Sequence, residues 1–518
     1  MIKQIAAPAV TDSLLKLRKQ FAEIQLGSEY FFQALDFLNW TELDSRKESP
    51  EGNQRFHVLL SGLLLMRKAN ISGSTCLPWE ILQTQITGSL LNSGFSVNEL
   101  TPDRWQKWLL TSFGTETDSD PFSVENSIFS EDNYLFYFSK YWQAESRLLS
   151  LLQKRIKMNP HVPESSLVEK VLETVLVEQP VRFGEETLRL ADEQKAAVLR
   201  SISSPLLIVT GGPGTGKTSI TITLLRVLKR LGLAERPALA APTGRAAKRM
   251  SETVVNSLNS LVNLKELPLE QKLLEDAAEA KTLHRLLAYR PGTHSFKHHE
   301  FDPLEHDLLI VDEGSMIDQE MMSSLLRAAN SELPHQQSVP RIILLGDAQQ
   351  LPSVGNGAVL LELTKNSSTP ETADIEENQL HVVRLRRSYR QEIGDAAGRN
   401  ILGVAETVKA MEDDPRPELL FAAREPNHEI IRRLKSLEEV GQEKVFLLNQ
   451  ANTPDKLLSF ASWWVENYLS DEKFIFETQH NFHYDAPESC TAQLDYLFDY
   501  LKHFRILTAT QVLPSGAA

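Results

Sequence analysis

The sequence contains only two cysteines, Cys76 and Cys490, among its 518 residues. Two thiols exclude a disulfide framework, and they exclude a zinc or iron–sulfur site built from four cysteines. Both are the ordinary thiols of a reducing compartment, so we expect a cytoplasmic protein.

The sequence also lacks a long uninterrupted apolar run. The longest run, Val58–Met66, is broken by Ser61 and Gly62 and is too short to span a bilayer, so we expect no membrane association. Residues Met1–Val10 lack the apolar core of a secretory signal peptide. With 42% hydrophobic and 24% charged residues, the composition is that of a soluble globular protein long enough for several domains.

Positive charge is in deficit, because 54 Lys and Arg residues stand against 69 Asp and Glu residues, for a formal net charge of −15. This balance argues against a general electrostatic attraction to nucleic acid but not against a local basic groove. Basic residues gather in two short stretches, 236–249 and 381–390. A solvated surface is the alternative interpretation of each stretch.

Glycine, by contrast, is concentrated in one loop that directly follows the apolar run Leu206–Val209. The loop reads Gly211, Gly212, Pro213, Gly214, Thr215, Gly216, Lys217 and Thr218. Glycines let main-chain N–H groups surround phosphates without side-chain collisions, and a helix expected over Ser219–Arg230 adds its N-terminus to the anion site. Lys217 is expected to reach the β and γ phosphates, and the Thr218 hydroxyl to bind Mg²⁺. The loop therefore predicts a site for ATP, the alternative being a glycine turn that binds nothing.

Two carboxylates follow a second apolar run, Leu308–Val311. Asp312 is expected to bind Mg²⁺ directly or through water, and Glu313 to polarise the water that attacks the γ-phosphate. A simple helix cap is the alternative, because Ser315 and Asp318 lie nearby in the sequence.

Three further side chains are candidates for the same site. Gln350 follows the apolar run Ile342–Leu345, where an amide can hydrogen-bond the γ-phosphate and sense its loss. Arg390 can supply positive charge to the transferring phosphoryl group. Gln194 precedes the first apolar run and can read the adenine edge with one donor and one acceptor. The alternatives are a polar turn, a surface arginine and an exposed helix glutamine.

A second set of residues is typical of contacts with nucleic acid phosphates. Pro242, Thr243 and Arg245 lie in a Thr/Gly turn that opens a basic helix, and Thr282 and His284 lie in a similar segment. Hydroxyl, main-chain N–H and arginine groups are the usual phosphate ligands. For His284 alone, a structural histidine is the alternative.

Short apolar runs alternate with helical segments between residues 185 and 395. This rhythm predicts an α/β fold with a parallel sheet and helices on both faces, with its chemistry at the carboxyl ends of the strands. We expect a mostly helical domain over 1–150, a linker over 151–184, and a nucleotide-binding domain over 185–395. A second α/β region follows over 396–518, with expected strands at Lys444–Leu448 and Arg505–Leu507.

The order of these segments resembles that of superfamily 1 helicases. Residues 211–218 resemble motif I, 241–248 motif Ia, 282–286 motif Ib, 312–315 motif II, 346–354 motif III and 388–390 motif IV. The variants at 241–250 and 346–355 resemble the RecD family, the alpha subunits of exodeoxyribonuclease V.

This resemblance implies RecA-like motor domains over 185–395 and 396–518. It implies a 5′-to-3′ DNA helicase that uses ATP and Mg²⁺, binds single-stranded DNA, and acts in double-strand break repair and recombination. In that family the N-terminal domain docks on the RecC subunit. The resemblance therefore predicts RecB-like and RecC-like partners, bound through residues 1–150.

One departure from the family pattern concerns motifs V and VI, which do not occur in the 518 residues. We interpret the region 396–518 as an incomplete second motor domain and the chain as a truncated, impaired helicase subunit. The alternative is a non-motor assembly component that binds partner subunits and at most nucleotide.

Overall fold

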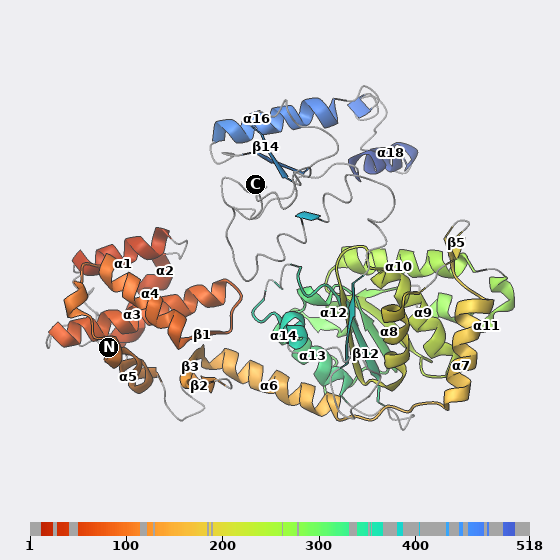
Figure 1. The fold of residues 1–518 in the computed structure, drawn as a ribbon, viewed down its shortest axis with the longest axis horizontal. Helices are drawn as coiled ribbons and strands as arrows, with labels where there is room; N and C mark the ends of the chain where they lie inside the picture. Colours follow the sequence, from red (N-terminus) through yellow and green to blue (C-terminus); the bar gives the residue numbers. More distant parts are fainter. Residues whose placement is uncertain are drawn as a thin grey trace, which may run out of the picture. The chain divides into compact units, whose positions relative to one another are not determined.

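In the computed structural model of this chain, the described residues fall into two compact units, Met1–Ser388 and Tyr389–Ala518 (Figure 1). The structure describes residues 12–23, 28–40, 50–113, 122–127, 130–183, 186–187, 190–261, 263–276, 279–330, 339–350, 353, 355–365, 381–386, 403–404, 431–434, 445–448, 454–470, 474–475 and 491–502.

The N-terminal part of the first unit is mostly helical. Its helices are α1 (Asp12–Glu23), α2 (Ser28–Trp40), α3 (Pro50–Ile71), α4 (Trp79–Asn92) and α5 (Pro102–Phe113), with a 3-10 turn at Val97–Glu99. An antiparallel sheet of order β1-β3-β2 adjoins them, formed by Cys76–Pro78, Ser130–Phe138 and Phe122–Ser127 respectively. The helices and this sheet share one apolar core that includes Phe56, Leu60 and Trp105. Among the described residues, no helix is both long enough and apolar enough to cross a membrane.

Helix α6 (Ser139–Ile156) leads from β3 to the larger sheet, so residue 150 lies inside a helix (Figure 1). Arg155 near its end is fully buried and donates hydrogen bonds to the carbonyl oxygens of Pro205 at 2.8 Å and Ala329 at 3.1 Å. These bonds fix α6 to the segments around the sheet. Helix α7 (Ser165–Glu173), a π-helical turn (η2, Thr174–Glu178) and the short pair β4–β5 follow, at Arg182–Phe183 and Glu186–Thr187.

The central feature is a parallel sheet of six strands in the order β13-β6-β12-β11-β7-β8. These strands are His381–Leu385, Leu206–Gly211, Arg341–Gly346, Leu308–Val311, Pro237–Ala241 and Lys281–Thr282, in that order. The predicted parallel α/β sheet is confirmed. The apolar runs Leu206–Val209, Leu308–Val311 and Ile342–Leu345 lie in β6, β11 and β12, and a further apolar run, Ala238–Ala241, lies in β7. Each is a buried run, as strands of a doubly covered parallel sheet are.

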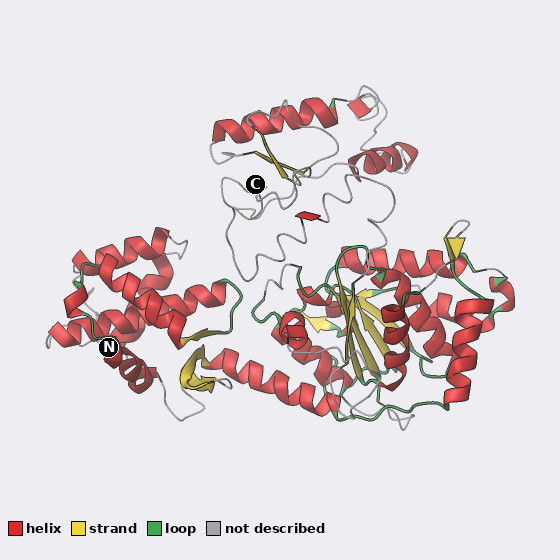
Figure 2. Ribbon diagram, in the orientation of Figure 1, coloured by secondary structure: helices red, strands yellow, loops and turns green. Residues whose placement is uncertain are grey.

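Helices cover both faces of the sheet (Figure 2). Alternate side chains of β6, β7, β11, β12 and β13 enter two separate cores, one on each face. Leu207 and Val209 pack with α8, α9 and α10, whereas Leu206 and Ile208 pack on the face covered by α6, α12, α13 and α14. The helices are α8 (Asp192–Ser203), α9 (Lys217–Arg230), α10 (Gly244–Asn259), α11 (Pro268–Asp276), α12 (Leu283–Leu286), α13 (Gln319–Ala329) and α14 (Val359–Lys365), with 3-10 turns η3 (Leu264–Glu266) and η4 (Gly314–Met316).

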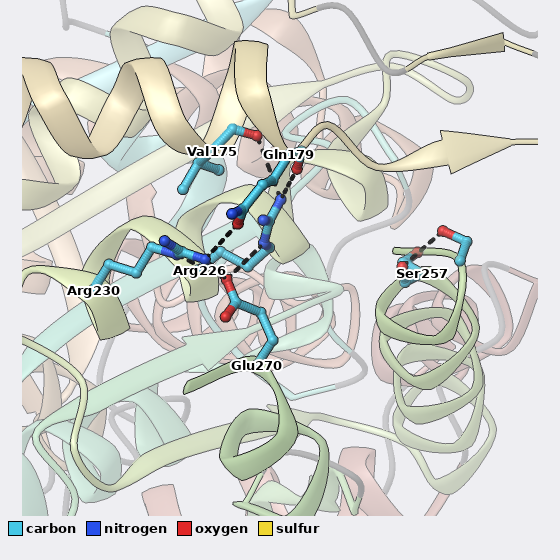
Figure 3. A network of polar contacts seen from close by, with 7 residues as sticks. Val175, Gln179, Arg226, Arg230, Ser257 and Glu270 are labelled. Carbon is cyan, nitrogen blue, oxygen red and sulfur yellow. Dashed lines mark hydrogen bonds and ion pairs between the residues drawn. The ribbon is translucent and has the colours of Figure 1, made fainter. Parts of the chain in front are cut away.

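A buried ionic network fixes α9 to its neighbours (Figure 3). Glu270 on α11 is 1% exposed and pairs with Arg226 at 3.3 Å and Arg230 at 2.7 Å, both from α9. Arg226 also donates to the Gln179 carbonyl at 2.8 Å, and Arg230 to the Gln179 side chain at 2.6 Å. The helix that starts at the phosphate loop is therefore held at its far end by α11 and the segment after α7.

The described part of the second unit contains a parallel pair, β14 (Ile431–Leu434) and β15 (Val445–Leu448). It also contains α16 (Pro454–Trp464), a π-helical turn (η7, Val465–Leu469) and α18 (Thr491–Lys502). The strand predicted at Lys444–Leu448 is β15. The strand predicted at Arg505–Leu507 lies outside the described residues.

Candidate functional site

The glycine-rich loop connects β6 to α9 at the carboxyl edge of the sheet. Gly214 and Gly216 have φ values of 78° and 83°, which only glycine adopts without strain, and Gly216 is the N-cap of α9. At Gly211 a Cβ atom would lie 2.8 Å from Leu385 Cβ on the adjacent strand β13. These positions require glycine because of main-chain conformation and close packing, so the loop shape is built into the sequence.

Lys217 lies at the first position of α9, and its side chain turns back over the loop. Its Nζ donates to the carbonyl oxygens of Gly212, at 3.0 Å, and Gly211. Thr215 is buried, and its hydroxyl donates to the same Gly212 carbonyl at 2.9 Å. The loop is thus held together by hydrogen bonds from the Thr215 and Lys217 side chains to its own carbonyl oxygens. The Thr218 side chain lies outside the part that the structure describes.

Gln194 on α8 is 2% exposed and contacts the phosphate loop directly. Its Nε2 donates to the Thr215 carbonyl at 3.1 Å, and its Oε1 accepts from the Ala191 main-chain N–H at 3.0 Å. Each end of the amide thus bonds the main chain with one of its two N–H donors or one of its two acceptor lone pairs. The predicted adenine contact would use the second donor and the second lone pair, or would replace one of these bonds.

Asp312 and Glu313 stand at the end of β11, two strands from the phosphate loop. Glu313 has a φ of 54°, and its main-chain N–H donates to Asp312 Oδ1 at 2.8 Å. Burial raises the pKa of Asp312, and the positive charges of Lys217 and Arg249 partly offset this. Burial and the neighbouring Asp312 likewise raise the pKa of Glu313. Both carboxylates thus lie within the electrostatic reach of Lys217.

A buried carboxylate whose charge is disfavoured fits a site that gains a cation when loaded. Mg²⁺ is usually bound through one or two carboxylates together with substrate phosphates and water, not by an all-protein cage. The part of the chain that the structure describes has no cluster of three or more His, Cys, Asp or Glu residues that could hold a metal alone. Asp312 beside a phosphate loop fits this kind of shared Mg²⁺ site.

The loop after β12 reaches the same edge of the sheet. The Ala348 N–H donates to Thr210 Oγ1 on β6 at 3.1 Å, and the Gln350 N–H donates to the Asp347 carbonyl at 3.1 Å. Gly346 lies against the segment after β11, since a Cβ there would come within 3.1 Å of the Gly314 nitrogen. Gln350 itself is exposed. Arg390, the remaining candidate for this site, lies outside the described residues.

The candidate nucleic-acid residues occupy two neighbouring strand ends. Strand β8 pairs with β7 so that Thr282 is opposite Ala241, the residue before Pro242. Thr243 and Thr282 have equivalent roles, because each caps a helix by accepting a main-chain N–H, from Ala246 at 3.3 Å and from Arg285 at 3.2 Å. The Arg245 and His284 side chains are exposed. The structure therefore brings all five candidates to one edge.

Two aromatic residues that the sequence pattern does not indicate also lie at this edge. Tyr289 and Phe296 lie on a hairpin formed by β9 (Tyr289–Arg290) and β10 (Ser295–Phe296). Their rings lie 5.3 Å and 5.8 Å from His284, centroid to centroid. A short Tyr-Arg-Pro-Gly turn is the only sequence signal for this hairpin, and it does not reveal the ring cluster.

The sheet, the glycine-rich loop and the paired carboxylates define a P-loop nucleotide-binding domain. Residues 194–356 match a family model described as an AAA domain. The chain is 32% identical to a RecBCD enzyme subunit RecD of Mycolicibacterium smegmatis, over 55% of this chain and 48% of that protein. It is 37% identical to a RecBCD enzyme subunit RecD of Haemophilus influenzae, over 45% of this chain and 34% of that protein.

A third relative, the ATP-dependent RecD2 DNA helicase of Deinococcus radiodurans, is 31% identical over 54% of this chain and 30% of its own length. The P-loop domain is thus similar in sequence to RecD subunits and to a RecD2 helicase, which agrees with the resemblance seen in the motifs. The chain spans about half or less of the length of these curated relatives.

Proposed function

We propose that this protein is an ATP-dependent DNA helicase subunit of the RecD type. The observation that carries the proposal is the convergence of the Lys217 loop, Asp312 and Glu313, and the Gln350 loop at one sheet edge, next to an edge with the Arg245 turn. Nucleotide groups and nucleic-acid groups on adjacent strand ends are the arrangement that a DNA motor requires. One relative is named as an ATP-dependent DNA helicase.

In this proposal each residue near the loop has a defined task. The glycine-loop amides and Lys217 hold the triphosphate, and Thr218 and Asp312 hold Mg²⁺, which neutralises charge on the phosphates when bound. Glu313 accepts the proton of the attacking water, for which a raised pKa is suited. Gln350 senses the γ-phosphate, Arg390 adds positive charge, and Gln194 contacts adenine.

The DNA path runs over Pro242, Thr243, Arg245, Thr282 and His284. Arginine, hydroxyl and main-chain groups there are suited to the phosphates of single-stranded DNA. The ring cluster around His284 offers a surface for base stacking. We propose movement in the 5′-to-3′ direction along this path.

The names of the RecD relatives place them in RecBCD enzymes. We propose by analogy a cytoplasmic role in double-strand break repair and recombination, with RecB-like and RecC-like partners. Residues 1–150 are the proposed docking region, because residues between Leu14 and Phe138 form an apolar core separate from those of the sheet.

The test is ATP hydrolysis with and without single-stranded DNA, compared between the parent chain and Lys217→Ala. We expect at least a tenfold loss of ATP affinity in the variant, because charge-assisted phosphate contacts contribute about 1.5–3 kcal/mol each. DNA-stimulated hydrolysis in the parent that is lost in Lys217→Ala would support the helicase subunit. Binding of a fluorescent ATP analogue without any DNA-dependent hydrolysis would instead support the non-motor assembly component.

A further inference from the structure

The loop that follows Gln350 is bonded to the N-terminal helical region. Asn356 Nδ2 donates to the main-chain carbonyls of Asn70 at 2.8 Å and Ser74 at 3.1 Å. The Gly357 N–H donates to the Gly73 carbonyl at 3.0 Å. Three hydrogen bonds therefore join the nucleotide side of the sheet to the turn between α3 and β1.

The same loop is bonded on its other side to the segment that follows the paired carboxylates. The Gln319 N–H at the start of α13 donates to the Asn356 carbonyl at 3.2 Å. Gly355 lies against Asp318, the N-cap of α13, so closely that a Cβ atom would collide with the carboxylate. The loops after β11 and β12 thus meet at Asn356.

The turn at residues 70–75, which accepts these hydrogen bonds, is itself held in place by further hydrogen bonds. Asn70 Nδ2 donates to the Ser74 carbonyl at 2.8 Å, and the Ser74 N–H donates to the Ala69 carbonyl at 2.9 Å. Thr75 Oγ1 donates to Glu145 Oε2 on α6 at 3.0 Å. The turn at 70–75 therefore offers two fixed carbonyl acceptors, and the Asn356 amide bonds both.

We propose that Asn356 is a positioning residue that holds the Gln350 loop against the N-terminal region and so sets where Gln350 stands during ATP turnover. The inference rests on the proposed function, in which Gln350 senses the γ-phosphate. It adds a mechanical link. A displacement of the 70–75 turn would move the loop that follows β12, and this loop contacts the segment that follows β11. A protein bound to the N-terminal region can act on hydrolysis by this route.

Two variants test the link in the full chain, Asn356→Ala and the isosteric Asn356→Asp. Neither can donate to the two carbonyls, and the aspartate adds an oxygen that repels them. The matched control is Asn330→Ala at the opposite end of α13, which removes a similar bond, 3.0 Å from Nδ2 to the Leu151 carbonyl on α6. The readouts are kcat and KM for ATP with single-stranded DNA, and amide hydrogen exchange over residues 347–360.

We expect both Asn356 variants to lower kcat at least fivefold with KM for ATP within twofold of the parent. Exchange of the Gly357 amide should rise at least tenfold, while Asn330→Ala leaves kcat within twofold and exchange in this segment unchanged. Parental kcat and exchange in both Asn356 variants, or an equal kcat loss in the control, would overturn the inference.

The exchange readout separates this inference from the proposed function. If the parent hydrolyses no ATP, the proposed function fails, and exchange with a non-hydrolysable ATP analogue and Mg²⁺ then decides the link. Nucleotide-dependent protection of 347–360 that is lost in both Asn356 variants supports it. Protection identical in parent and variants, or none in the parent, refutes it.

Discussion

The Nε2 amide of Gln194 donates a hydrogen bond to the main-chain carbonyl of Thr215 at 3.1 Å, so a helix preceding β6 braces the phosphate loop from behind. A residue that braces the loop affects every nucleotide equally, whereas one that reads adenine distinguishes bases. We expect Gln194→Ala to lower ATP affinity about tenfold, as the loss of a hydrogen bond of roughly 1.4 kcal/mol would, and GTP affinity less. Equal losses in titrations with both nucleotides would assign Gln194 to bracing alone.

Asp312 is buried at the end of β11, and burial raises its pKa above the ordinary value of 3.8. The native protein therefore binds this proton more tightly than the unfolded chain, so the carboxyl lowers stability as pH rises through the raised pKa. We expect Asp312→Asn to raise the melting temperature of the nucleotide-free protein by about 2–4 °C at pH 7.

The effect of Asp312→Asn should shrink as the pH falls towards 3.8, because the parent carboxyl is then protonated. The same variant should lose the extra stabilisation that Mg²⁺ adds to ATP. Thermal melting across pH, with and without ATP and Mg²⁺, measures both effects. A parent that is the more stable at pH 7 without nucleotide would contradict the prediction.

Glu313→Gln should leave ATP and Mg²⁺ binding within threefold of the parent and lower DNA-stimulated hydrolysis at least a hundredfold. Glutamine keeps the shape of the side chain but cannot accept the proton of water, and general-base catalysis contributes roughly 10²–10⁴-fold. Single-turnover hydrolysis checks this result. A parental rate would assign the base to another residue.

Arg245→Ala should weaken binding of single-stranded DNA and flatten its salt dependence by roughly 0.7 in the logarithmic slope, for one lost phosphate contact. ATP affinity should not change. The control is Arg236→Ala, which removes a partly exposed arginine just before β7, at the opposite end of the same strand from Arg245. Fluorescence anisotropy over a salt series separates the two, and equal slopes for both variants would exclude Arg245 from the DNA path.

Glu270→Ala should destabilise the first unit by about 3–5 kcal/mol, because it leaves Arg226 buried without its carboxylate. The control is Glu300→Ala, which removes a pair of similar length, 2.8 Å to Arg327, between side chains that are 43% and 39% exposed. The loss of folding stability in this control should stay below about 1 kcal/mol. Urea unfolding followed by tryptophan fluorescence compares them, and similar shifts would contradict the burial argument.

The P-loop, the carboxylates and the apolar strands could be predicted because each is a local pattern. Gly211–Thr218 and Asp312–Glu313 follow buried strands, and parallel strands bring their carboxyl ends together. Contacts between distant segments have no such local signal. The bonds from Asn356 to Asn70 and from Arg155 to Pro205 depend on packing that no short pattern encodes.

The hydrogen bond of Gln194 is a second contact that could not be predicted from the sequence. The sequence position of this glutamine predicts a contact with adenine, which stays a prediction, whereas its bond to the Thr215 carbonyl depends on the loop conformation. The ring cluster of His284, Tyr289 and Phe296 likewise depends on a hairpin only a few residues long. Contacts between side chains in loops therefore could not be predicted from the sequence, because they depend on the three-dimensional arrangement of those loops.

The strand order has a consequence for synthesis on the ribosome. Strand β6, which carries the phosphate loop, pairs with β12 and β13, both of which are translated long after it. At a synthesis rate of about 5–20 residues per second, Leu385 emerges roughly 10–35 seconds after Gly211. Leu385 packs directly against Gly211 in the folded protein. Both edges of β6 lack a partner strand until β12 emerges, and the edge that pairs with β13 lacks one until Leu385 emerges. The nucleotide site is consequently the last part of this sheet to form, although its sequence is the first of the sheet to be made.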